Sequence, residues 1–146
     1  MSTSYWSLVE SFWEEINIYD GPEVFNRTYL AVPETSRLLF AAHFAQSEIC
    51  NGGFRQFFYN STGVLGPEAL DGFRRIGMEE TADTVAKAME CLGQPYPRDR
   101  EERKEKLSTL NVDDLNQLDD KFFDLIDTEN GGFEAAADRF AASCLT

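Results

Sequence analysis

The residue types best suited to nucleophilic chemistry are few in this chain: one histidine, His43, and three cysteines, Cys50, Cys91 and Cys144. His43 and Cys50 stand seven residues apart in one predicted helix and therefore share a face. Seven residues also mean ~10.5 Å of axial rise, which is too far for a nucleophile and a base to share a hydrogen bond. The dispersed cysteines fit reduced thiols better than a disulfide frame or a zinc site. We predict no enzyme activity, no metal and no cofactor.

Carboxylates are arranged more regularly, on a helix predicted over residues 112–127. Four of its aspartates fall within about 40° of one line at 100° per residue: Asp113, Asp120, Asp124 and Asp127. Apolar residues occupy the opposite side of this helix. Such a stripe favours a basic partner through complementary potentials, and we predict these aspartates as partner-binding residues. A solvated helix face carries the same pattern, so the sequence leaves open whether the stripe binds or only confers solubility.

The stripe is sparser than the phosphates of DNA. Asp113 to Asp127 spans ~21 Å of helix rise, a length in which one DNA strand places about six phosphates. Further carboxylates would have to come from the first predicted helix, through Glu10 and Glu14, or from a second subunit.

The run from Asn51 to Gly63 combines a paired glycine with closely spaced aromatic residues. The glycines supply the left-handed backbone that ends a helix. After the glycines, polar side chains are interleaved with aromatic ones. The motif residues that we single out are Asn51, Gly52, Gly53, Phe54, Gln56, Phe57, Phe58 and Asn60. Together with Arg55, the polar members either line a small pocket or bond the free backbone groups of a helix junction. The junction is the interpretation we favour.

The string from Asn51 through Arg55 to Phe58 resembles the signature of a family of bacterial DNA mimics, small acidic all-helical proteins formerly catalogued as a domain of unknown function. The resemblance is strongest over residues 38–63 and extends over most of the chain. It implies a compact helical fold without catalytic residues and a negative surface that occupies the DNA-binding surface of a partner such as a transcription factor. It also implies a homodimer, which the sequence by itself does not decide.

The overall charge agrees with a basic partner. Twenty-six acidic and 13 basic residues give a net charge of −13, which disfavours direct binding to nucleic acid or to an anionic membrane. The N-terminus has no basic region or apolar signal core, and no apolar stretch is long enough to span a bilayer. We therefore expect a soluble cytoplasmic protein.

The length of 146 residues and the apolar content of 42% suit one domain over residues 1–146. Apolar residues recur at helical spacing and no segment alternates as a strand would, so we predict an all-α fold, a single compact multi-helix bundle. The predicted helices cover residues 4–18, a segment opened by Pro22, 33–50, 54–59, 66–77, 79–92, 98–106, 112–127 and a last one around 133–141.

Two other functions fit the same residues. An immunity- or antitoxin-type inhibitor of a basic toxin would use the same electrostatics, and only the identity of the partner separates it from a DNA mimic. A small-molecule-binding module would use Asn51, Arg55, Gln56 and Asn60, and it requires a pocket where the first two functions require none.

Overall fold

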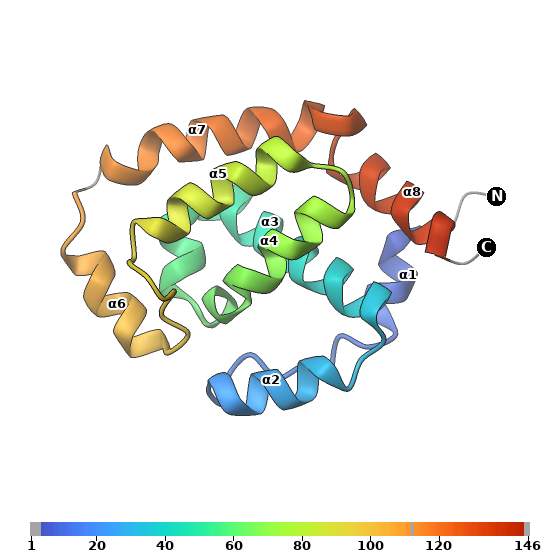
Figure 1. The fold of residues 1–146 in the computed structure, drawn as a ribbon, viewed down its shortest axis with the longest axis horizontal. Coiled ribbons are helices and arrows are strands. Elements are labelled where there is room, and N and C mark those ends of the chain that lie inside the picture. The colour runs from blue at the N-terminus through green and yellow to red at the C-terminus, as the bar shows by residue number, and fades with distance from the viewer. Residues whose placement is uncertain (1–3, 112, 145–146) are drawn as a thin grey trace.

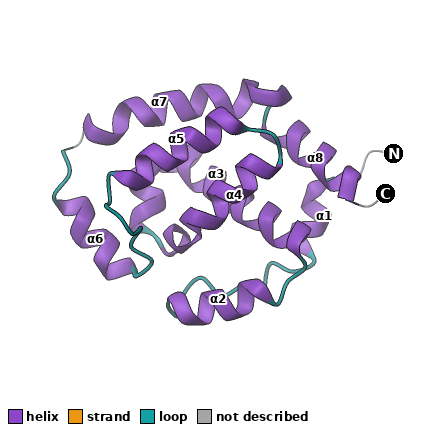
Figure 2. Ribbon diagram, in the orientation of Figure 1, coloured by secondary structure: helices purple, strands orange, loops and turns teal. Residues whose placement is uncertain are grey.

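The computed structural model describes residues 4–111 and 113–144, and all the regular structure within them is helical (Figure 2). The α-helices are α1 (Tyr5–Glu10), α2 (Pro22–Leu30), α3 (Glu34–Tyr59), α4 (Gly66–Arg75), α5 (Glu79–Glu90), α6 (Arg100–Ser108), α7 (Asp113–Thr128) and α8 (Phe133–Cys144). Two short 3₁₀ helices, η1 (Ser61–Leu65) and η2 (Glu129–Gly131), connect α3 to α4 and α7 to α8. The predicted all-α fold is confirmed. The predicted start of α7 at residue 112 lies outside the described residues.

Helix α3 is the centre of the bundle, because it packs against α1, α4, α6 and α7. Figure 1 shows α7 lying lengthwise beside α5 at one edge, α8 and α1 together at one end, and α6 at the other end. Helix α7 packs on both α5 and α3. One side of α7 is therefore covered by the bundle and the other is left on the outside.

The break predicted at the paired glycine is present within α3. Gly53 has φ +78° and Gly52 has φ −148°, so the helix changes direction there before continuing through Tyr59. A side chain on Gly53 would be strained by that positive φ, and its Cβ would also stand 2.7 Å from a carboxylate oxygen of Asp119. The second half of α3 buries Phe54, Phe57 and Phe58 completely.

Tyr59, the last residue of α3, is not buried like these phenylalanines, as a helix that carries all its aromatics into the core would require. Its side chain is half-exposed, and its ring lies 5.5 Å from the guanidinium of Arg100 and 5.0 Å from the amine of Lys104. Tyr59 follows two consecutive inward phenylalanines, and 100° further round the helix it faces α6 and solvent.

The predicted helix over residues 4–18 is also wrong in its length, since α1 ends at Glu10. The chain leaves it in tight turns, in which Phe12 N–H donates to Val9 O at 3.1 Å and Glu15 N–H donates to Phe12 O at 3.0 Å. The turns carry the chain over α3 and bury Ile16. Polar side chains then replace helical bonding, because the Asn17 N–H donates to Thr28 Oγ1 on α2.

Arg103 of α6 holds the end of α3 in place. Its side chain is almost fully buried, and it donates from Nε to Phe58 O at 2.8 Å and from a terminal nitrogen to Asn60 O at 3.0 Å. Phe58 O lies in the last turn of α3, where carbonyls lack partners within the helix, and Asn60 O also accepts the Gly63 N–H at 3.0 Å. Burial lowers the pKa of Arg103, and the carbonyl oxygens around it accept bonds from its charged group.

Candidate functional site

Helix α7 has two sides of opposite character. Leu115, Phe122 and Ile126 are buried against the bundle, and the Phe122 ring meets Phe54 edge-to-face at 5.5 Å between centroids. The four aspartates predicted as partner-binding residues are all exposed: Asp113, Asp120, Asp124 and Asp127. We call this exposed set the α7 acidic face.

No basic side chain that the structure describes forms an ion pair with the α7 acidic face. Among the described residues, the ion pairs of 4.0 Å or less lie between residues 34 and 104, and none includes an aspartate of α7. Asp113 accepts a hydrogen bond from the neutral amide of Asn116 at 3.3 Å. The face therefore keeps its negative charges available to a partner.

Two other acids of α7 have structural roles that sequence reasoning missed. Asp119 Oδ1 accepts the Phe54 N–H at 2.8 Å, which caps the helix half that restarts after Gly53. Burial raises the pKa of Asp119, although the bond from Phe54 opposes that shift. Asp114 accepts the Asn111 N–H at 2.8 Å and so fixes the start of α7. The role of Asp114 has a signal in the sequence, the three-residue spacing of a capping box. The bond of Asp119 has no such signal, because it joins residues 65 apart.

The structure does not place Glu10 and Glu14 beside α7. Both are exposed, but α1 packs on α3 and α8, away from the length of α7 (Figure 1). The acid that adjoins the stripe is Glu134 of α8, which lines a hollow of about 340 Å³ together with Asp127 and Cys50. Burial, and next the charge of Asp127, raise the pKa of the Cys50 thiol.

The polar residues of the glycine motif hold a helix junction together. Arg55 donates to Leu107 O at 3.5 Å. The amides differ from our interpretation, because Gln56 and Asn60 bond a side chain of α3, Glu48, and not the backbone. Arg103 bonds the backbone carbonyls of Phe58 and Asn60 at this junction, as described above. Asn51 is exposed.

Glu48, which the sequence analysis did not single out, is the centre of this network. Its Oε2 accepts from Gln56 at 2.6 Å, and its Oε1 accepts from Asn60 at 3.2 Å and from Thr62 at 3.1 Å. A carboxylate has about four acceptor positions, so one has no donor among the described residues. No basic side chain in the described residues forms an ion pair with Glu48 within 4.0 Å.

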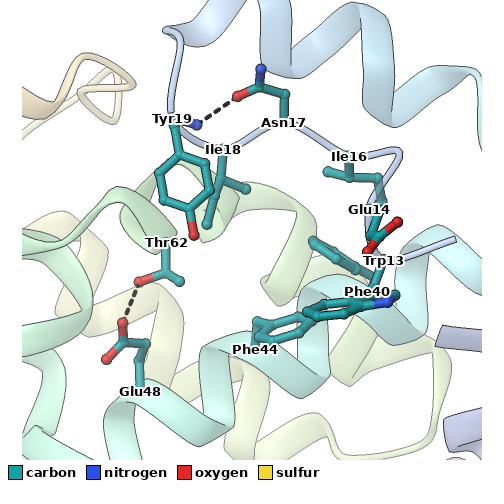
Figure 3. A pocket seen from close by; sticks show the side chains of 10 residues that line it. All are labelled: Trp13, Glu14, Ile16, Asn17, Ile18, Tyr19, Phe40, Phe44, Glu48 and Thr62. Carbon is teal, nitrogen blue, oxygen red and sulfur yellow. Dashed lines mark hydrogen bonds between the residues drawn. The ribbon is translucent and has the colours of Figure 1, made fainter. Parts of the chain in front are cut away.

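Glu48 lines a cleft of about 540 Å³ in volume. Figure 3 shows the cleft between the segment after α1 and one side of α3. Its lining is Trp13, Glu14, Ile16, Asn17, Ile18, Tyr19, Phe40, Phe44, Glu48 and Thr62. Glu14, which we singled out as a partner-binding residue of the first predicted helix, lines this cleft.

His43 connects α1 to α3. Its Nδ1 lies 2.9 Å from the Tyr5 hydroxyl, and its ring lies 4.9 Å from the rings of Trp6 and Phe44. Burial lowers the pKa of His43. Cys50 Sγ instead contacts Gln46 Oε1 at 4.0 Å. His43 and Cys50 thus have different hydrogen-bond neighbours. The described residues contain no cluster of His, Cys, Asp or Glu suited to a metal ion.

The fold and its charged helix define a small acidic all-helical protein with an unneutralised outer face. The chain belongs to the DMP19-like protein family, whose model matches residues 30–143; this is a family of DNA mimics. No curated protein and no solved structure matches the chain. The match includes α7 and Glu48 but not the segment that carries Trp13 and Glu14. Within the described residues, no helix has the length and apolar character needed to cross a bilayer.

Proposed function

We propose that this protein is a non-enzymatic acidic binding protein that occupies the basic DNA-binding surface of a partner, such as a transcription factor, in the manner of a DNA mimic. The observation that carries this proposal is the α7 acidic face, whose aspartates are exposed and have no ion pair among the described residues. Membership of the DMP19-like family supports the same function.

The rigidity of the face adds to this argument. Buried Phe122 and Ile126 anchor α7 from beneath, and Asp119 ties α7 to α3. A rigid row of charges meets a partner without a large ordering cost. The arginines and lysines of the partner would exchange bound counterions for these carboxylates, so affinity should fall steeply with salt.

The spacing of charges favours an extended face. Four carboxylates over ~21 Å are fewer than the phosphates of one DNA strand. Glu134 extends the row beyond Asp127 around their shared hollow, and a homodimer would lengthen it further. We propose Glu134 as an additional contact and retain the homodimer as part of the hypothesis.

The test begins with a partner captured from extract by the immobilised protein at low salt and eluted with salt. The partner is then bound to its DNA, and displacement by the acidic protein is followed in a gel-shift titration. Reversal of charge at Asp120→Lys with Asp124→Lys should abolish displacement. A matched control reverses Glu101→Lys with Glu105→Lys, an equally spaced pair that is exposed on α6.

Displacement that survives reversal on α7, or that is lost equally on α6, contradicts a role for the α7 acidic face. A captured partner that binds no DNA and has toxin activity would replace the DNA mimic by the immunity-type inhibitor. The two functions are thus separated by the partner and not by the surface.

A further inference from the structure

The cleft beside α3 has the dimensions and walls of a small-molecule site. Its volume of about 540 Å³ lies within the ~300–1,000 Å³ that ligand pockets usually have. Phe40 and Phe44 form one wall, with ring centroids 4.7 Å apart. Trp13 and Tyr19 border the opening and leave 49% and 77% of their surfaces exposed. Binding of a ligand that covers this apolar surface is favourable, because it removes the surface from water.

The charges in this cleft select the sign of the ligand. The two ionisable acids of the lining are Glu14 and Glu48, and the lining contains no lysine, arginine or histidine. Aromatic faces attract cations through their quadrupoles, so the apolar walls and the carboxylates favour the same charge. An anionic ligand would be repelled.

Glu48 is held in position to receive a hydrogen-bond donor. Gln56, Asn60 and Thr62 all donate to it, so the carboxylate is oriented before any ligand arrives. One acceptor position has no donor in the part of the chain that the structure describes. Figure 3 shows this carboxylate bonded to Thr62 next to Phe44, with the Tyr19 ring above. Donors that fix a carboxylate without neutralising it prepare it for a positively charged ligand.

We infer that this cleft binds a small organic cation, an amine whose apolar body lies against Trp13, Phe40 and Phe44 and whose ammonium group donates to Glu48. The site is separate from the α7 acidic face and does not depend on the proposed DNA mimicry. The wall from Trp13 to Tyr19 precedes the residues that match the family, 30–143, so the cleft needs a segment outside the matched region.

The experiment uses three indoles of similar size and different charge: tryptamine, its alcohol analogue tryptophol, and indole-3-propionate. Binding to the full chain is measured by calorimetry near neutral pH and low salt. Tryptamine should bind at millimolar concentration or below, tryptophol about tenfold more weakly because it lacks the charge-assisted bond, and indole-3-propionate should not bind detectably.

Variants locate the site. Glu48→Gln should weaken tryptamine about tenfold, and Trp13→Ala should weaken it by a similar factor, whereas Glu15→Gln, exposed in the same segment but outside the lining, should have no effect. Trp13 is half-exposed, so its truncation tests the site even if Glu48→Gln disturbs the junction. Absence of tryptamine binding, equal affinity for tryptophol, or unchanged affinity in Trp13→Ala would overturn the inference.

Discussion

The two sides of α7 use the same residue type for different purposes. Asp119 and Asp120 are neighbours in sequence, yet Asp119 caps Phe54 while Asp120 is exposed and has no ion pair with any described residue. A rotation of 100° separates them. The number of acids in a helix therefore says little about binding until the carboxylates with internal partners have been removed from the count.

The same distinction applies between α7 and the bundle surface formed by α4 and α6. There Glu68 of α4 meets Arg98 in a two-point contact at 2.7 and 2.9 Å, and Glu101 of α6 meets Lys104 at 3.5 Å. On α7, Lys121 is the sole basic residue between Asp113 and Thr128, and it lines a different hollow with acids of α5. Among the described residues, the exposed aspartates of the α7 acidic face thus lack the ion pairs that Glu68 and Glu101 form.

The comparison of the two sides of α7 is tested most strongly at two adjacent phenylalanines. Phe122→Ala should lower the free energy of unfolding by ~3–5 kcal/mol, because it removes a fully buried ring and leaves a cavity. Phe123→Ala should lower the free energy of unfolding by about 1 kcal/mol or less, because Phe123 is 38% exposed. Urea denaturation of both variants measures the difference; equal losses would show that α7 is not anchored as described.

The two adjacent aspartates give a smaller contrast. Asp119→Ala should destabilise the protein by about 1 kcal/mol through loss of the Phe54 cap. Asp120→Ala should change stability by less than about 0.5 kcal/mol. Chemical denaturation again provides the measurement, and amide exchange at Phe54 should accelerate only in the Asp119 variant. A protected Phe54 amide in that variant would contradict the cap.

Titration separates buried from exposed ionisable groups. Burial lowers the pKa of His43 from its ordinary value of 6.5 in the folded chain, so the unfolded chain binds a proton first as the pH falls. Stability is therefore lost as the pH decreases below 6.5. A protonated ring also can no longer accept a hydrogen bond at Nδ1, the atom that lies 2.9 Å from the Tyr5 hydroxyl. Denaturation at about pH 7.5 and about pH 5.5 should show this loss in the wild type and a smaller one in His43→Gln.

The smallest effect concerns exposed charge on its own. Asp124→Asn should raise stability by ~0.2–0.5 kcal/mol at low salt, because it relieves repulsion from Asp120 one turn away. Glu101→Gln on α6 should lower stability by a similar amount, since it removes a pair with Lys104 at 3.5 Å. Both effects should shrink in high salt. A loss of stability in Asp124→Asn would mean that the outer face has an internal partner.

Much of the helical arrangement was predictable from local pattern. Apolar spacing located α5 and α7 within a few residues, and the paired glycine predicted the break at Gly53. The end of α1 was not predictable, because turns after Val9 and the bond from Asn17 to Thr28 depend on the packing of this segment over α3 and α2. Helical periodicity alone would continue α1 through Ile16.

The candidate site divided in the same way. Exposure of the four aspartates followed from the amphipathic pattern of α7, whereas the positions of Glu10 and Glu14 did not, since no pattern in α1 encodes which helices it meets. Glu48 was missed because a lone glutamate in an apolar helix carries no signal. Its partners Gln56, Asn60 and Thr62 become visible as a network only after α3 has turned at Gly53.

The sequence by itself determined the helical class, the acidity and the two-sided character of α7, because these depend on residue type and on the 3.6-residue period. Tertiary structure decided which carboxylates have internal partners, that Glu134 adjoins Asp127, and that Trp13 covers a cleft ending at Glu48. The bond from Phe54 to Asp119 and the cleft join segments far apart in the chain, and Glu134 meets Asp127 only because the chain turns at η2 between α7 and α8. Such contacts are set by the packing of whole helices, which no local spacing specifies.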